Sequence, residues 1–189
     1  MQAVIVQPGA PGDETKRISP GKATDLSRVQ HTDDDVKFMQ GMIGHHRQAV
    51  EMAALVPSRS SREDFRLLAQ RIDVSQQDEI KMMQEWLKAR GQEAPAEHAH
   101  HMEGAELMPG MLTPEEMTRL AAAAGTEFER LFLQGMIKHH AGALFMVKEL
   151  FSQPGAGQES EIFAFASDVD ADQRMEIRRM EIMLKEILK

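Results

Sequence analysis

Histidine and methionine recur together in this 189-residue chain, and the same arrangement is present twice. The segment FMQGMIGHH at residues 38–46 returns 94 residues later as FLQGMIKHH at 132–140, with seven of nine positions identical. Met42 precedes the first histidine pair by three residues, and Met136 precedes the second pair by three. On a helix this spacing places thioether and imidazole on one face. These are donors that copper ions favour, so each copy is a candidate copper ligand set.

A second pair of matched segments follows the histidines. The pattern QxxEIxxM is present at residues 76–83 and again at 173–180. If each copy folds as a helical hairpin, the rise of 1.5 Å per residue brings Asp73 and Gln76 to the height of the first histidine pair. The same reasoning brings Asp170 and Gln173 to the second pair. Imidazole, carboxamide and carboxylate then form a polar layer inside the bundle, with Glu79 and Glu176 at its edges.

Such a layer has two interpretations. Buried polar groups are costly unless they are paired or bind something. The histidines could therefore satisfy the glutamine and aspartate side chains, or they could hold a metal ion. The recurrence of four histidines at matched positions favours a ligand over simple pairing.

A third concentration of histidine and methionine lies between the two copies. It comprises His98, His100, His101, Met102, Met108 and Met111. Histidine-rich tracts are typical of metal binding. This segment could be an exposed site of metal capture, or a solvated connection whose methionines pack against the bundle.

The elements that position these side chains are all helical. Start signals at Thr32, Ser60 and Thr113-Pro114, and stop signals at Pro57, Gly91 and Pro154, predict helices over 33–56, 61–90, 114–151 (with a break near Gly125) and 160–188. We expect an all-α, four-helix up-down bundle made of two repeated hairpins. Residues 1–30 are expected to be an extended segment and 31–189 one domain, with repeat one at 32–91, the loop at 92–112 and repeat two at 113–189.

Composition excludes several classes of protein. A net charge of −8 argues against a nucleic-acid partner. The absence of cysteine excludes disulfides, zinc–thiolate sites and thiol catalysis. No apolar run reaches the ~18 residues of a membrane span, so no membrane insertion is expected. Most of the fifteen methionines are expected to fill the core, because thioether chains adapt to irregular gaps. Residues 2–30 contain several prolines and glycines and resemble the linker that often follows a removed leader, as in a mature form.

These motifs resemble the family called domain of unknown function 305. The resemblance rests on the repeated MIxHH and QxxEIxxM segments and on the linker MPGMLT at 108–113. It implies a ferritin-like four-helix bundle, export from the cytoplasm, and copper association in some members, with no established reaction. The family motif falls on Met42, His45, His46, Met136, His139 and His140. It also implies an acidic residue before each motif, a place filled by Asp35 and Glu129.

The leading hypothesis is a copper-binding protein of the cell envelope or exterior that sequesters Cu⁺ or Cu²⁺ or passes it to a delivery partner. The candidate ligands and their supporting carboxylates are His45, His46, His139, His140, Met42, Met136, Met52, Met146, Asp73, Asp170, Glu79, Glu176, His98, His100, His101, Met102, Met108 and Met111. One alternative is a ferritin-like dinuclear iron or manganese oxidoreductase, which the QxxE spacing resembles. Hard metals call for more carboxylates than these segments supply. The other alternative is a non-catalytic structural or binding module whose histidines have only a structural role in the core.

Overall fold

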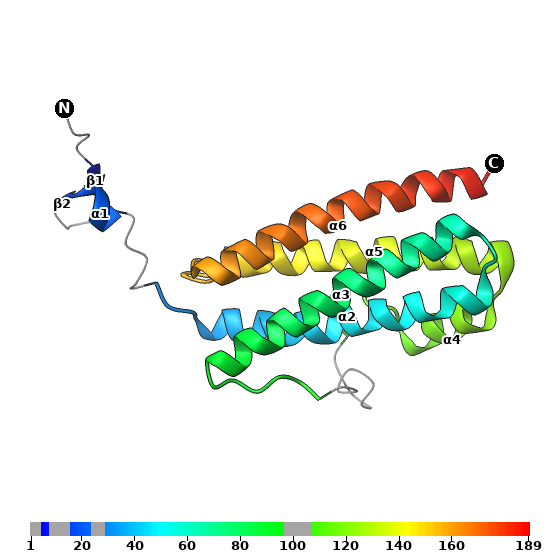
Figure 1. Ribbon diagram of the computed structural model, residues 1–189, viewed down its shortest axis with the longest axis horizontal. Coiled ribbons are helices and arrows are strands. Elements are labelled where there is room, and N and C mark those ends of the chain that lie inside the picture. The colour runs from blue at the N-terminus through cyan, green and yellow to red at the C-terminus, as the bar shows by residue number, and fades with distance from the viewer. Residues whose placement is uncertain (1–4, 8–15, 24–28, 97–106) are drawn as a thin grey trace.

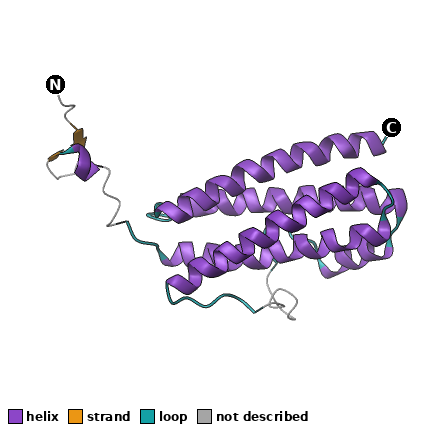
Figure 2. Ribbon diagram, in the orientation of Figure 1, coloured by secondary structure: helices purple, strands orange, loops and turns teal. Residues whose placement is uncertain are grey.

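The computed structural model describes residues 5–7, 16–23, 29–96 and 107–189 (Figure 1). Four long helices make up most of the molecule, and they are α2 (Asp33–Arg59), α3 (Glu63–Ala89), α5 (Gly125–Ser152) and α6 (Ser160–Ile187). The shorter α4 (Pro114–Ala122) precedes α5. Before the bundle, β1 (Ile5–Gln7) pairs antiparallel with β2 (Lys16–Ile18), and α1 (Pro20–Ala23) follows. Figure 2 shows how far helix dominates the described residues.

Most of the expected helix ends are confirmed. Thr32 with Asp35, and Thr113 with Glu116, form capping boxes at the starts of α2 and α4. The expected break near Gly125 is also confirmed, because that glycine has a φ of 57° where α4 gives way to α5. A positive φ lies outside the helical range and is readily adopted by glycine, so the chain turns at Gly125 as α5 begins.

Two expected signals were wrong. Pro57 lies inside α2, which continues two residues further to Arg59, so the helix does not stop at this proline although Pro57 cannot donate to the carbonyl four residues before it. Ser60 does not cap α3; it is the C-cap of α2, and Arg62 precedes α3 without a side-chain cap. The Ser60 hydroxyl instead donates to Glu129 Oε1 of the other hairpin at 2.6 Å.

The two hairpins, α2–α3 and α5–α6, lie against each other through α2 and α5 (Figure 1). Strict up-down alternation was expected, but α3 and α5 run in the same direction (Figure 1). The reason lies in the connection from α3 to α4: its described parts contact α2 first at Gln40 and then at Gln48, so the chain returns toward the end where α3 begins before it enters the second hairpin (Figure 1). One long crossover of this kind fits a ferritin-like bundle.

Side chains of α2 hold the crossover against the bundle. Gln48 donates from Nε2 to the Leu112 carbonyl at 2.9 Å and accepts from the Leu112 amide at 2.7 Å. Near the start of the crossover, Gln40 donates to the carbonyl of Glu93 at 2.8 Å. The Gln48 pair is buried and the Gln40 bond is exposed, so the first contributes more to stability.

In each hairpin, a buried carboxylate also accepts a hydrogen bond from the turn of the other hairpin. Asp35 of α2 accepts from the amide of Gly157, in the α5–α6 turn, at 2.7 Å. Glu129 of α5 accepts from Ser60, after α2, at the opposite end. Asp35 and Glu129 occupy equivalent positions of the two repeats, so the two contacts are reciprocal.

Replacing Gln48 with Ala is expected to lower the free energy of unfolding by roughly 1–3 kcal/mol, because the Leu112 N–H and C=O would lose their buried partners. Chemical denaturation monitored by circular dichroism measures this difference. The matched control is Gln40→Ala, which removes an exposed bond to the same crossover and is expected to cost under about 0.5 kcal/mol. Equal losses in the two variants would contradict this account.

Candidate metal centre in a buried histidine layer

The four histidines of the repeated segments have 0% exposure and form one layer across the bundle. On one side lies an apolar cluster that includes Met42 and Phe165. On the other side lies a second cluster, which includes Met136 and Phe65. The predicted polar layer in the middle of the bundle is therefore present, and it divides the apolar core into two halves.

The outer member of each pair contacts a glutamate of its own hairpin. Nε2 of His46 lies 2.5 Å from Glu79 Oε2, and Nε2 of His140 lies 2.7 Å from Glu176 Oε2. Glu176 also lies 3.4 Å from the guanidinium of Arg71 on α3. These carboxylates fix the orientation of the outer imidazoles.

The inner members, His45 and His139, meet each other between α2 and α5. Their ring centroids are 3.8 Å apart, with 35° between the planes. Nε2 of His45 donates to the Pro109 carbonyl at 3.0 Å, and Nε2 of His139 donates to the His45 carbonyl at 2.9 Å. A carbonyl only accepts, so Nε2 carries the hydrogen in both rings.

Both inner imidazoles are held in the neutral form. Burial, and then the neighbouring His46, lowers the pKa of His45 to about 3. Burial, and then His45, lowers the pKa of His139 well below its usual value. With Nε2 protonated in a neutral ring, Nδ1 carries a lone pair.

Those lone pairs have no hydrogen-bond partner. Nδ1 is unpartnered in all four histidines of the layer, and so is Oε1 of Gln76 and of Gln173. Buried polar atoms normally have a hydrogen-bond partner, so six atoms without one in a single layer require an explanation. Metal-binding imidazoles typically donate their other N–H to a carboxylate or carbonyl, which is the arrangement of all four rings here.

The predicted aspartates are not the partners of the histidines. Asp73 accepts from Gln77, and Asp170 accepts from Arg174, each four residues along its own helix. Of the carboxylates considered in each hairpin, the structure brings Glu79 and Glu176 to the imidazoles. A glutamate side chain is one methylene longer than an aspartate side chain, and Glu79 and Glu176 reach the histidines of the neighbouring helix in their own hairpins.

The predicted methionines occupy three kinds of position. Met42, Met52 and Met136 are fully buried, and Met111 is 4% exposed. Met108 and Met146 are partly buried, and their ends approach Gly41, one residue before Met42. His98, His100, His101 and Met102 lie outside the described residues.

Sequence reasoning missed the acceptor of His45. The Pro109 carbonyl belongs to a turn closed by the Met111 amide on the Met108 carbonyl at 3.1 Å, with Gly110 at a φ of 79°. The turn lies so close to α5 that a Cβ on Gly142 would come 1.8 Å from the Pro109 oxygen. A Pro-Gly pair is typical of a turn, but no pattern in the sequence indicates that the carbonyl of Pro109 accepts from a histidine.

Within the described residues, no group of three or more His, Asp or Glu side chains is arranged to hold a metal ion. The thioethers of Met42 and Met136 lie in the apolar clusters beside the layer, and thioether and imidazole are the donors that soft ions favour.

Comparison with known proteins identifies the family. The domain of unknown function DUF305 matches residues 35–184, which cover all or nearly all of each helix of the bundle. The chain belongs to the DUF305 family. No functionally curated protein matches its sequence.

Solved structures of DUF305 proteins resemble this DUF305 chain. One is a protein of Streptomyces coelicolor whose name describes it as secreted, at 33% identity and a TM-score of 0.68, covering 82% of this chain and 93% of that one. Another is a fragment from Deinococcus radiodurans, at 34% identity and a TM-score of 0.69, covering 82% and 98%.

The protein CopM is also similar to this DUF305 chain. Its Cu(I)-bound form has 26% identity and a TM-score of 0.63, covering 83% of this chain and 98% of CopM. Its Cu(II)-bound form has 26% identity and a TM-score of 0.64. In the part of the DUF305 chain that the structure describes, no helix combines the length and apolar character needed to cross a membrane.

The metal-free DUF305 protein is expected to lose stability as the pH falls from about 6.5 toward 3. In this range His45 and His139 stay neutral in the folded state but gain protons on unfolding, which costs up to roughly 1.4 kcal/mol per pH unit for each ring. Urea unfolding at pH 7, 6 and 5 measures the slope. The His45→Gln/His139→Gln variant should show a shallower fall, since carboxylate titration is common to both proteins. Parallel pH profiles would disprove this account.

Proposed function

We propose that this DUF305 protein binds copper, chiefly Cu(I), in the histidine layer. The observation that carries the proposal is the set of four buried imidazoles, each held through Nε2 and unpartnered at Nδ1. Cu(I) accepts two or three imidazole and thioether donors without any carboxylate in its coordination shell. The layer offers those donors in a site from which water is excluded.

The roles divide between ligands and supporting groups. Nδ1 of His45, His46, His139 and His140 would supply nitrogen, with sulfur from Met42 and Met136. Glu79 and Glu176 would orient the outer rings, as second partners of metal-bound histidines do. The carbonyls of Pro109 and His45 would do the same for the inner rings.

The position of the two methionines favours two copper sites over one. Met42 belongs to the apolar cluster on one side of the layer, and Met136 to the cluster on the other. Because α2 and α5 are antiparallel, each methionine lies one turn beyond the layer in opposite directions. One thioether is thus available above the imidazoles and one below them.

Further methionines could lead the ion to the layer. The sulfur of Met108 and the methyl end of Met146 both approach Gly41, and Met52 approaches the equivalent Gly135. His98, His100, His101 and Met102 would add a metal-capture site, while Met111, which follows them along the chain, is buried against the bundle. Asp73 and Asp170 could contribute only by leaving their present partners.

The comparisons support a copper ligand and an external location. CopM was solved with Cu(I) and with Cu(II), and it shares this fold at 26% identity. The relative from Streptomyces coelicolor is described as secreted. We infer that the protein sequesters copper, or passes it to a delivery partner, outside the cytoplasm.

A dinuclear iron or manganese centre has less support. Both glutamates of the repeated QxxE segments already contact a histidine Nε2. The described residues present no set of three carboxylate or imidazole side chains arranged for a metal. Hard ions prefer several oxygen ligands, which this layer does not bring together.

Competition for Cu(I) under reducing conditions tests the proposal. The parent is expected to bind two ions. The variant with His45, His46, His139 and His140 all changed to Gln should lose them, with at least a tenfold weaker affinity. Gln places an N–H near the position of Nε2, so the supporting hydrogen bonds are retained while the Nδ1 ligand is lost. Circular dichroism verifies that this variant folds.

Two controls locate the ions. Met42→Leu should abolish binding of one of the two Cu(I) ions, and Met136→Leu should abolish binding of the other. A chain with His98, His100 and His101 changed to Ala and Met102, Met108 and Met111 to Leu should keep both layer sites. If the four-glutamine variant binds Cu(I) with the stoichiometry and affinity of the parent, the layer is not the copper site. Binding of iron or manganese in place of copper would favour the dinuclear alternative.

A further inference from the structure

The sequence repeat extends further toward the N-terminus than the histidine segments. Residues 18–26 read ISPGKATDL, and residues 112–120 read LTPEEMTRL. The offset is again 94, with Pro, Thr and Leu identical and two further positions similar. The structure reflects this match, since α1 begins at Pro20 and α4 begins at Pro114. The segment around α1 is therefore the counterpart of α4.

In the second repeat, α4 covers the groove between α2 and α5 at one end of the bundle. Leu120 is 1% exposed and belongs to the apolar cluster that includes Phe132, Met52 and Val56. Lys138 of α5 also pairs with Glu116 of α4 at 2.7 Å. Both apolar burial and an ion pair hold α4 in place.

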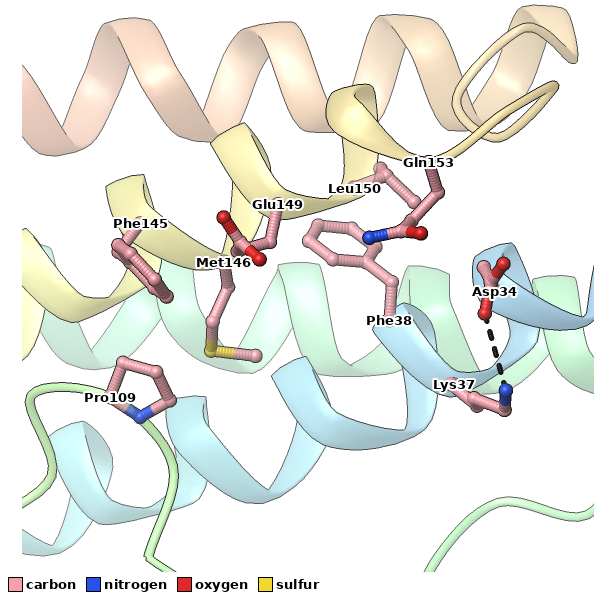
Figure 3. A pocket seen from close by; sticks show the side chains of 9 residues that line it. All are labelled: Asp34, Lys37, Phe38, Pro109, Phe145, Met146, Glu149, Leu150 and Gln153. Carbon is pink, nitrogen blue, oxygen red and sulfur yellow. Dashed lines mark hydrogen bonds and ion pairs between the residues drawn. The ribbon is translucent and has the colours of Figure 1, made fainter.

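The equivalent groove at the other end of the bundle has the same floor. It has a volume of about 410 Å³ and is lined by Phe38, Met146 and Leu150 among others (Figure 3). These three residues stand 94 positions from Phe132, Met52 and Val56. Phe145, on its wall, is 49% exposed. The surface against which α4 packs thus exists twice, and only one copy is covered by α4.

The rim of this groove differs in polarity from its counterpart. Asp34, Lys37 and Glu149 line it, where the covered groove has Phe128, Leu131 and Leu55. The segment around α1 carries a charge of each sign, at Lys22 and Asp25, and the small Ala23 where α4 has Met117. Asp34 pairs with Lys37 within the rim at 3.2 Å, and Glu149 offers a negative charge to Lys22.

We propose that the segment from Ile18 to Leu26 docks in this groove as α4 docks in the other. In Figure 1 α1 lies beyond the end of the bundle, so the docked position is a second one. The chain has the reach for it, because 26 residues separate Ser19 from His45, just as 26 separate Thr113 from His139. Docking would cover Met146 and the flank of the Pro109 turn.

Cysteine pairs test this contact in the full-length protein, which has no cysteine of its own. Ala23 and Glu149 are the counterparts of Met117 and Leu55, which pack against one cluster in the second repeat. The Ala23→Cys/Glu149→Cys protein is expected to form an intramolecular disulfide at least tenfold faster than Ala23→Cys/Lys88→Cys. Lys88 is the matched control, since it is exposed and lies at the same end of the bundle.

A third substitution separates docking from random encounter. Leu26→Asp, added to the Ala23→Cys/Glu149→Cys protein, should slow the cross-link to the rate of the control, because it replaces the counterpart of the buried Leu120. None of these substitutions alters a residue of the bundle core, and circular dichroism verifies that each variant folds. Equal rates for the two cysteine pairs, or no effect of Leu26→Asp, would overturn the proposal.

Discussion

The need to give every buried imidazole an acceptor governs how this bundle is assembled. Four rings with no solvent contact must each place a hydrogen bond, and an unmet donor would cost about 1–3 kcal/mol. Glu79 and Glu176 meet two of these needs from within each hairpin, which fixes the register of α3 on α2 and of α6 on α5. The His45 carbonyl meets the third and fixes α5 on α2. The Pro109 carbonyl meets the fourth and fixes the crossover.

The reciprocal contacts at the two ends of the bundle reinforce this register. Asp35 and Glu129 each reach the turn of the opposite hairpin, so neither hairpin can slide without breaking a buried hydrogen bond. Between these ends the two apolar clusters supply burial but little specificity, because methionine side chains adapt to many packings. Polar contacts thus set the geometry, and apolar burial supplies most of the stability.

Much of this arrangement could be predicted from the sequence, because the helix period and rise locate side chains to within about a turn. That was enough to place Gln76 and Gln173 in the layer with the histidines. It was not enough to choose between Asp73 and Glu79, whose difference lies in side-chain reach and direction. The shared direction of α3 and α5 also escaped prediction, since it depends on where the crossover travels. The end of α2 also differs from the expectation, since the helix continues past Pro57 to Arg59 and a local stop signal does not by itself fix where a helix ends.

The supports of the two inner histidines differ, although their positions in the repeat are equivalent. His139 donates to the backbone of α2, one of the four long helices of the bundle. His45 donates to a turn in a connecting segment, and that turn is placed by its close approach to Gly142 of α5. The two halves of a duplicated site therefore depend on different parts of the chain. A substitution that shifts the Pro109 turn would act on the His45 imidazole, while His139 would keep its acceptor on α2.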